Sequence, residues 1–214
     1  VANWNDSSGL GRTLTATGGT VIFKTNIRNG NGVCRFNGAD GTDQLSRANA
    51  GGEFFDSNGI TAFVVWAHTT SGASPWILSG PTPILAIQQF DASNCRATAY
   101  SSGSYFTGNK TQPADGSWHI STIHFSPNLL YYGCDDTRIA SMASVSIAPA
   151  FDLAGTETIY VGQSWGVAMI GDIAEMVFYD RDLTESERMS IEGYLGGKYA
   201  ITLPYGGGSF MIFQ

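Results

Sequence analysis

The clearest pattern of hydrophobic and polar positions lies in residues 171–199, where it predicts a strand followed by a helix. Residues 172–180 are apolar at both alternating sets of positions, which is typical of a strand in the middle of a packed sheet. We therefore expect this strand to lie at the centre of a sheet and to close the core. One predicted face carries Ile173, Val177 and Tyr179, and the other carries Ala174, Met176 and Phe178.

The residues after this strand predict a capped amphipathic helix. Thr184 and Glu187 have the spacing of a capping box, in which each side chain satisfies a backbone N–H of the first turn. The pair Gly196-Gly197 is expected to end the helix, because glycine adopts the left-handed conformation without a Cβ penalty. The apolar stripe comprises Ile191, Leu195 and Tyr199, with Tyr194 beside it. The face expected to meet water comprises Glu185, Ser190 and Glu192.

Elsewhere, short apolar runs alternate with turns rich in Gly, Pro, Asn or Asp, at a spacing of roughly ten residues that is typical of a β-sandwich. No linker or shift in composition divides the chain, so we predict one domain over residues 1–205. A Gly-rich tail follows over residues 206–214, and its apolar end is interpreted as a final strand or a segment that contacts a partner. The other strands expected are residues 21–24, 33–37, 60–67, 76–79, 84–90, 96–100, 118–125, 129–133, 138–142 and 158–162.

Composition narrows the setting in which the protein works. Of its 214 residues, 43% are hydrophobic and only 14% are charged, while 27 are glycine. A surface of neutral polar groups suits extracellular or virion-surface proteins, and we expect that localisation. The 11 Lys and Arg residues are scattered singly in a chain of net charge −7, which argues against nucleic acid as a partner. No apolar run approaches the roughly 20 residues of a membrane-spanning helix, so we expect no membrane insertion.

The three cysteines do not have the spacing of metal ligands. Cys34 lies in an apolar strand pattern and is interpreted as a small buried residue. Cys95 and Cys134 are able to pair in an oxidising compartment, but sequence does not establish a disulfide. The interpretation that we favour is three free thiols.

Several short motifs occur in order between residues 4 and 199. They are Trp4-Asn5-Asp6-x-Ser8-Gly9-x-Gly11; Phe36-Asn37-Gly38-x-Asp40 followed by Leu45; Asp115-Gly116-Ser117-Trp118-His119; Gly171-Asp172-Ile173-Ala174-Glu175 with Tyr179-Asp180-Arg181; Leu183-Thr184-x-x-Glu187; and Tyr194-Leu195 with Lys198-Tyr199. This ordered set resembles the concanavalin A-like lectin/glucanase superfamily, in the laminin-G-like type found in many bacterial and phage proteins. The resemblance implies an all-β jelly-roll sandwich of two antiparallel sheets with one short C-terminal helix. It implies no single function, because this fold hosts lectins, hydrolases, lyases and structural modules.

Glycoside hydrolysis is the enzymatic activity that this resemblance raises. A retaining glycosidase needs two carboxylates about 5 Å apart, and glucanases of this fold carry an acid-x-acid-x-acid row on one strand. Glu175 is the carboxylate of the predicted central strand, but its same-face neighbours are Ile173 and Val177. The row is absent, so we expect no enzyme and no catalytic residue. We interpret Glu175 as a structural group, hydrogen-bonded to backbone near a loop or a helix end.

The sequence requires no cofactor, and calcium is the ion that the resemblance suggests, through oxygen ligands at the rim of the sheets. None of the candidate loops has the alternating Asp/Asn pattern of a dedicated calcium loop, and Asp in a Gly-rich turn usually bonds to nearby backbone instead. His119 and His124 differ by five positions, so they lie on opposite faces of one strand and do not share a metal. The calcium candidates are Asp40, Asp43, Asp56, Asp135 and Asp136.

Glycan binding needs exposed aromatic side chains beside amide and carboxylate groups. Trp165 is the strongest candidate, because a loop Trp flanked by glycine has little core to fill, although it also suits a cover for the sandwich end or a subunit contact. We predict a non-catalytic, lectin-like module that binds a glycan or another cell-surface ligand, in a phage virion or bacterial surface protein. The alternatives are a structural decoration or assembly subunit of a viral particle, with virion neighbours or copies of itself as partners, and an atypical glycoside hydrolase. The candidate ligand-binding residues are Trp165, Gln163, Trp76, Tyr100 and Tyr105.

Overall fold

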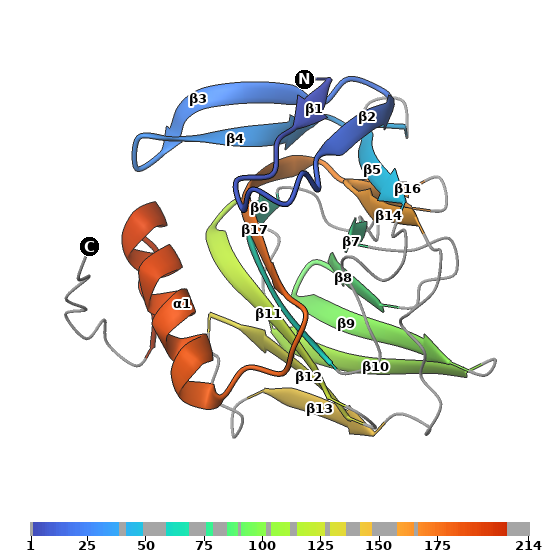
Figure 1. Cartoon of the computed structure of the whole chain (residues 1–214), viewed down its shortest axis with the longest axis vertical. Helices are drawn as coiled ribbons and strands as arrows, with labels where there is room; N and C mark the ends of the chain where they lie inside the picture. The colour runs from blue at the N-terminus through green and yellow to red at the C-terminus, as the bar shows by residue number, and fades with distance from the viewer. Residues whose placement is uncertain are drawn as a thin grey trace.

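Antiparallel strands and one helix make up the described part of the chain (Figure 1). Within it, no helix is long and apolar enough to cross a membrane. The computed structural model describes residues 2–38, 42–48, 59–68, 76–78, 85–89, 91–101, 104–111, 115–126, 129–135, 142–146, 158–164 and 167–204.

One layer is a seven-stranded sheet in the order β13-β12-β11-β6-β17-β4-β3 (Figure 1). Every residue of β6 is buried, because both of its faces are apolar and both are covered. The prediction of a central strand at residues 172–180 is confirmed, since β17 pairs with β6 on one side and with β4 on the other. The strands are β3 (Ile22–Arg28), β4 (Asn31–Phe36), β6 (Ile60–His68), β11 (Trp118–Ser126), β12 (Leu129–Cys134), β13 (Ala143–Ser146) and β17 (Gly171–Tyr179).

The opposite layer consists of two four-stranded sheets, in the orders β1-β2-β5-β14 and β10-β9-β8-β7. Strand β14 lies beside β7, so the two sheets meet there, and the hairpin β15-β16 follows β14. The predicted all-β sandwich of antiparallel sheets is therefore confirmed, with its second layer divided in two. These strands are β1 (Asn3–Trp4), β2 (Leu14–Gly18), β5 (Gln44–Ala48), β7 (Trp76–Leu78), β8 (Leu85–Gln89), β9 (Asn94–Ser101), β10 (Ser104–Thr111), β14 (Thr158–Val161), β15 (Gln163–Ser164) and β16 (Val167–Ala168).

The core between the layers contains apolar side chains from all three sheets. Trp66 of β6 is fully buried, and its indole N–H donates to Ser121 Oγ at 3.0 Å. Ser121 Oγ also lies 3.1 Å from the Tyr132 hydroxyl, so the polar atom of each buried aromatic has a partner. The two small sheets contribute Leu14, Leu45, Ile159 and Val161 from one and Ile87, Cys95 and Ala97 from the other.

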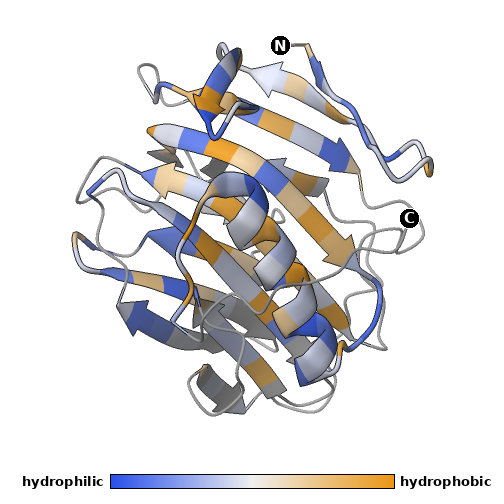
Figure 2. Ribbon diagram, turned by 90° about the vertical axis from the view of Figure 1, so that its left-hand side faces the viewer, coloured by the Kyte–Doolittle hydropathy of each residue, from blue (hydrophilic) through white to orange (hydrophobic). Residues whose placement is uncertain are grey.

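Helix α1 (Glu185–Tyr199) lies across the outer face of the seven-stranded sheet (Figure 2). The predicted capping box is confirmed, because Glu187 N donates to Thr184 Oγ1 at 3.3 Å and Thr184 N donates to Glu187 Oε2 at 2.8 Å. A second apolar cluster joins the helix to the sheet and makes the molecule three layers deep. Its buried members are Phe63, Val65, Ile120, Leu183, Leu195, Tyr199, Ile201 and Leu203.

The predicted end of the helix at Gly196-Gly197 is wrong. The helix continues to Tyr199, and Ala200 takes the left-handed conformation, with φ of 51°. A Cβ on Gly196 would lie 3.0 Å from Leu203 Cδ1. Gly196 therefore lets the segment after the helix pack closely against it, and it does not stop the helix.

Side chains of the β3–β4 hairpin satisfy the last carbonyls of the helix. Arg28 Nε donates to Tyr199 O at 2.6 Å, and Asn31 Nδ2 donates to Lys198 O at 3.0 Å. The side chain of Asn29 donates to Lys198 O as well, at 2.9 Å. These donors meet carbonyls that have no partner inside a helix, so residues near the beginning of the chain fix the end of α1.

The predicted polar face of the helix is wrong at Glu192, which is fully buried and accepts a hydrogen bond from Thr122 Oγ1 at 3.3 Å. Arg188, one turn earlier, is only 1% exposed. Both residues fall on the same helical stripe as Leu195 and Tyr199, and the sheet beneath that stripe offers polar groups as well as apolar ones. Glu185 and Ser190 are exposed as predicted. Tyr194, which the sequence placed beside the apolar stripe, is 48% exposed.

The predicted faces of β17 are wrong at its beginning. Ile173 packs with Met176 and Phe178 in the core between the layers, whereas Ala174 packs with Val177 in the cluster under the helix. The cause is a β-bulge, because the register between β17 and β6 shifts between Ile173 and Glu175. An extra residue in one strand reverses the alternation beyond it.

Most predicted strands agree with the structure to within a few residues, but β2, β5, β10 and β13 were not predicted, nor were the two-residue strands β1, β15 and β16. Of the strand expected at 138–142, only Met142 lies within the described residues, directly before β13. The tail at 206–214 also lies outside them, and the single domain over 1–205 stays a prediction. The three cysteines are buried and free, as we expected.

Candidate functional site

The candidate ligand-binding residues lie in the sheet β10-β9-β8-β7 or in and beside the hairpin β15-β16. Trp76 begins β7, Tyr100 lies in β9, Tyr105 lies in β10 and Gln163 begins β15. For these four positions the structure describes the backbone and not the side chain. Trp165 lies outside the described residues. Their role as ligand-binding residues therefore stays a prediction, and strand register brings together only positions 76, 100 and 105.

The register of the sheet β10-β9-β8-β7 places three of the aromatic positions on one face. Tyr105 is directly opposite Tyr100, Trp76 is directly opposite Gln88, and Gln88 is directly opposite Arg96. Residues that are opposite each other in an antiparallel pair share a face, and so do residues two apart on one strand. Positions 76, 88, 96, 100 and 105 therefore belong to the same face.

That face is turned away from the core. Ile87, Cys95 and Ala97 occupy the alternate positions and belong to the core cluster. From here on, the outer face means the opposite side of this sheet β10-β9-β8-β7, and not the face of the seven-stranded sheet that α1 covers. By alternation and register it comprises Trp76, Ala86, Gln88, Asn94, Arg96, Thr98, Tyr100, Tyr105, Thr107, Asn109 and Thr111.

Apart from Ala86, which is fully buried, the described side chains of the outer face are polar. With its amide oxygen toward Arg96, Gln88 accepts hydrogen bonds from Nε at 3.1 Å and Nη2 at 3.0 Å. Gln88 and Thr98 are buried, at 0% and 1% exposure, whereas Thr107 and Asn109 are exposed. Thr98 Oγ1 makes no hydrogen bond to any described residue, although buried hydroxyls nearly always have a partner. Among the described residues, the outer face therefore combines a guanidinium, a buried amide and a buried hydroxyl that has no described partner with aromatic positions beside them.

Of the calcium candidates, the structure describes Asp43 and Asp135. Asp43 is 3% exposed, and its carboxylate accepts hydrogen bonds from Thr20 N at 2.5 Å and Asn37 N at 2.8 Å. This is a structural role, in which the carboxylate joins the turns beside β4 and β5. Asp40, Asp56 and Asp136 lie outside the described residues.

Asp135 instead lies beside a histidine and a cysteine. Its Oδ2 is 2.7 Å from His119 Nδ1, and Cys134 Sγ is 3.8 Å from the same oxygen. His119 and His124 lie on opposite faces of β11, as predicted: His119 faces this cluster, and His124 contacts the helix residue Arg188 at 3.2 Å. The sequence analysis did not bring Cys134 and His119 together, because that requires the register of β11 with β12.

Glu175 holds the last turn of the helix to the sheet. Its Oε2 accepts hydrogen bonds from Lys198 Nζ and from the Tyr199 hydroxyl, both at 2.9 Å. Desolvation of the ammonium lowers the pKa of Lys198, but the bond to Glu175 outweighs it and raises that pKa above its ordinary value. Glu175 thus lies near a helix end as expected, but its hydrogen-bond partners are side chains and not backbone groups.

Replacing Glu175 with glutamine is expected to lower the free energy of unfolding by less than about 1 kcal/mol, because the pair with Lys198 is partly exposed to solvent. The side chains of the two residues are 25% and 31% exposed. Chemical unfolding of the Glu175→Gln variant measures the change, and Glu185→Gln, an exposed carboxylate of the same helix, is the control. A polysaccharide hydrolase activity that disappears in Glu175→Gln alone would instead support the glycosidase alternative.

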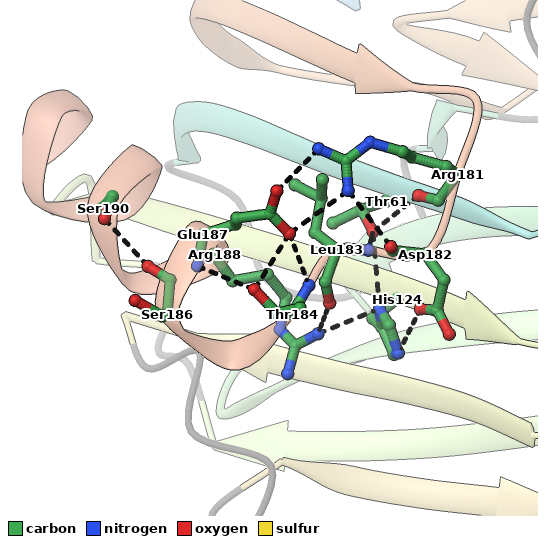
Figure 3. A network of polar contacts seen from close by, with 10 residues as sticks. All are labelled: Thr61, His124, Arg181, Asp182, Leu183, Thr184, Ser186, Glu187, Arg188 and Ser190. Atoms are coloured by element: carbon green, nitrogen blue, oxygen red, sulfur yellow. Dashed lines mark hydrogen bonds and ion pairs between the residues drawn. The ribbon is translucent and has the colours of Figure 1, made fainter.

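A buried polar network ties the β17–α1 connection to the sheet (Figure 3). Arg188 Nη1 donates to Leu183 O and to His124 Nδ1, the latter at 3.2 Å, and His124 Nε2 lies 2.7 Å from Asp182 Oδ1. Thr61 Oγ1 donates to Arg181 O and accepts from Leu183 N, both at 3.1 Å. Burial, followed by the Arg188 charge, lowers the pKa of His124 to about 4. The imidazole is therefore neutral at pH 7, which agrees with its role as an acceptor from Arg188, and the network is structural.

No family model and no curated protein matches the sequence. Solved structures match in fold. Domain 4 of AbnA, a GH43 extracellular arabinanase from Geobacillus stearothermophilus, solved with arabinotriose, has a TM-score of 0.65 and 18% identity over 86% of this chain and 89% of that chain. The binding domain of botulinum neurotoxin DC in complex with SialylT has a TM-score of 0.68 and 11% identity over 89% of this chain and 48% of that chain.

A third match is full-length tailspike protein 2 of the Escherichia coli bacteriophage CAB120, with a TM-score of 0.58 and 16% identity over 87% of this chain and 27% of that chain. The matched region makes up about half the length of the neurotoxin binding domains. At these identities the likeness shows the fold alone. The class of protein that fold and comparison define together is a β-sandwich domain, a fold also found in toxin binding domains, in an arabinanase and in a phage tailspike.

Proposed function

We propose that this chain is a lectin-like recognition module of the concanavalin A-like type, which binds a glycan or another surface ligand without catalysing a reaction. The observation that carries the proposal is the register that gathers Trp76, Tyr100 and Tyr105 on the outer face with Gln88 and Arg96. A sugar presents apolar C–H faces and hydroxyl groups. Aromatic rings beside a few fixed polar groups are the combination that binds such a ligand.

Within the part of the chain that the structure describes, the Thr98 hydroxyl has no hydrogen-bond partner, which supports a polar ligand on this face. Thr98 is 1% exposed and adjoins the aromatic positions through the alternation of β9. A hydroxyl that is buried without a partner costs about 1–3 kcal/mol, which a ligand or a bound water recovers when it bonds there. A recognition role for the outer face explains why the position is polar at all.

The matched structures support the same class of ligand. The arabinanase domain was solved with arabinotriose, and the neurotoxin DC binding domain was solved both with SialylT and with rat synaptotagmin II. These partners belong to those proteins. The arabinanase domain, of which the match covers 89%, supports a sugar ligand more directly than the neurotoxin chains, of which it covers about half. We place the module in an extracellular or virion-surface protein, in keeping with its neutral polar composition.

Replacing Tyr100 and Tyr105 together with alanine is expected to weaken glycan binding at least about tenfold, the equivalent of 1.4 kcal/mol. Ligands are first found on an array that includes arabino-oligosaccharides and sialylated glycans, and affinities are then measured by calorimetry. Tyr194→Ala is the matched control, because Tyr194 is 48% exposed on α1, away from this sheet. Trp165→Ala tests the sequence-based candidate separately. Equal affinities for the double variant and the control would contradict a site on the outer face.

A second candidate function is assembly, as a structural subunit that contacts virion neighbours or copies of itself. It is favoured by β3, the terminal strand of the seven-stranded sheet, on which Phe23 and Ile27 are 54% and 40% exposed. Exposed apolar side chains on an edge strand are typical of surfaces that pair with a neighbour. Failure to bind any glycan, together with a stable oligomer in light scattering, would favour this function over the first.

A further inference from the structure

Three side chains that commonly bind metal ions meet where β11 begins and β12 ends. His119 Nδ1 lies 2.7 Å from Asp135 Oδ2, and Cys134 Sγ lies 3.9 Å from the nitrogen and 3.8 Å from the oxygen. One nitrogen, one sulfur and one oxygen thus form a compact triangle. The side chains of His119 and Asp135 are 14% and 23% exposed, so an ion reaches them from solvent.

The backbone holds these groups in place without using their free ligand atoms. Cys134 is opposite Ser121 in the register, which places it diagonally across from His119 on the same face. Asp135 leaves the strand in the left-handed conformation, with φ of 53°. Its backbone N donates to Ile120 O at 2.8 Å, and its Oδ1 accepts from Ile120 N at 2.6 Å. One carboxylate oxygen is therefore anchored, and the other faces the histidine and the cysteine.

We propose that His119, Cys134 and Asp135 bind a divalent ion of the zinc class, with a fourth position open to water or to a ligand. Imidazole and thiolate are ligands of zinc and cobalt, whereas calcium takes oxygen ligands, so this site differs in kind from the calcium site for which the sequence made Asp135 a candidate.

The distances fit a tetrahedral zinc site. Bonds of about 2.0–2.3 Å separate neighbouring ligand atoms by roughly 3.3–3.6 Å. The two sulfur distances, 3.9 and 3.8 Å, are slightly longer than these values, and the 2.7 Å contact between His119 and Asp135 has to open by roughly 0.6–0.9 Å. On binding, the thiol releases its proton to solvent, and the imidazole offers the Nδ1 lone pair while its proton resides on Nε2.

The simpler alternative is a structural hydrogen bond between His119 and Asp135, with Cys134 as a small buried residue. That pair explains two of the three groups, but it gives no role to a sulfur that faces both of them. Within the described residues, His119 Nε2 is buried and makes no hydrogen bond, so the polar contacts of the ring are those with this cluster. The two interpretations differ in what Cys134 does when metal is added.

Cobalt(II) distinguishes them, because a thiolate bound to cobalt absorbs strongly in the near ultraviolet and a tetrahedral site absorbs in the visible. The full chain is freed of metal with a chelator and titrated with CoCl₂. We expect both absorptions to saturate at one ion per chain, to disappear when zinc is added, and to survive an excess of calcium. In Cys134→Ser the ultraviolet band is expected to be lost, with zinc affinity reduced at least tenfold.

Cys95→Ser is the matched control, because Cys95 is a buried thiol outside the cluster. It is expected to keep the full cobalt spectrum. Zinc is also expected to raise the melting temperature of the wild type and of Cys95→Ser, but not that of His119→Gln, which serves as the second variant if Cys134→Ser does not fold. Absence of the ultraviolet band in the wild type, or its persistence in Cys134→Ser or His119→Gln, would overturn the proposal.

Discussion

Replacing Arg188 with methionine is expected to lower the free energy of unfolding by about 3 kcal/mol. Arg188 is 1% exposed, and it donates to Leu183 O and to His124 Nδ1. Methionine keeps the apolar stem and the helix propensity, so the change isolates the guanidinium. The carbonyl and the ring nitrogen both lose a buried donor, and each such loss costs on the order of 1–3 kcal/mol.

An opposing effect limits this loss. Burying a cation is expensive, and replacing a whole buried ionic group by apolar residues is sometimes neutral or stabilising. We expect destabilisation here because the partners of Arg188 stay in place and stay buried. Urea unfolding of Arg188→Met measures the change. Arg181→Met is the control, since Arg181 is 53% exposed and pairs with Glu187 at the surface, and we expect a change of less than about 1 kcal/mol. Unchanged or raised stability in Arg188→Met would show that desolvation of the guanidinium outweighs its hydrogen bonds.

Lowering the pH from about 7.5 to about 5 is expected to reduce stability through His124 by on the order of 2 kcal/mol. The pKa of His124 is lowered to about 4 in the folded protein, below the ordinary value of 6.5. The unfolded chain therefore takes up the proton first. The stabilisation is fully present above about pH 6.5 and is lost as the pH falls toward 4, because a protonated ring no longer accepts from Arg188.

Urea unfolding at the two pH values, in the wild type and in His124→Gln, measures this contribution. Burial lowers the pKa of His68 to about 4 as well, so the wild type has two such groups and His124→Gln is expected to lose about half of the pH dependence. His68→Gln is the control that removes the other half. Burial raises the pKa of Asp182, an effect of opposite sign. A pH dependence that is identical in the wild type and in His124→Gln would show that the pKa of His124 is the same in the folded and unfolded states, and would contradict this prediction.

Local patterns predicted the elements that depend on neighbours in the sequence. The capping box at Thr184 and Glu187 was predictable, because both partners lie within one turn. The faces of β17 were predicted correctly from Met176 onward and wrongly before it, because a bulge is a property of the pairing with β6 and not of the strand itself. In the same way, Glu192 was assigned to water because a helical pattern does not show that the sheet beneath it carries Thr122.

Polar strands were the main omission. Strand β10 reads Ser104–Thr111 with few apolar residues, because it forms the edge of a sheet with one face in water. Without β10, the pairing of Tyr100 with Tyr105 was not visible, although the sequence analysis had selected both. The cluster of His119 with Cys134 had a usable signal. A tight hairpin that pairs Ser126 with Leu129 fixes Ser121 opposite Cys134, and the position of His119 follows.

The closing strand also constrains the order in which this chain is able to fold. β17 lies between β4 and β6, although about 100 residues of chain separate it from the nearer of the two. Until β17 has been synthesised, β4 and β6 each have an unpaired edge, and β6 is apolar on both faces. Such edges pair readily with other chains. A nascent chain of this protein is therefore most prone to aggregation late in translation, just before β17 leaves the ribosome and pairs with β4 and β6.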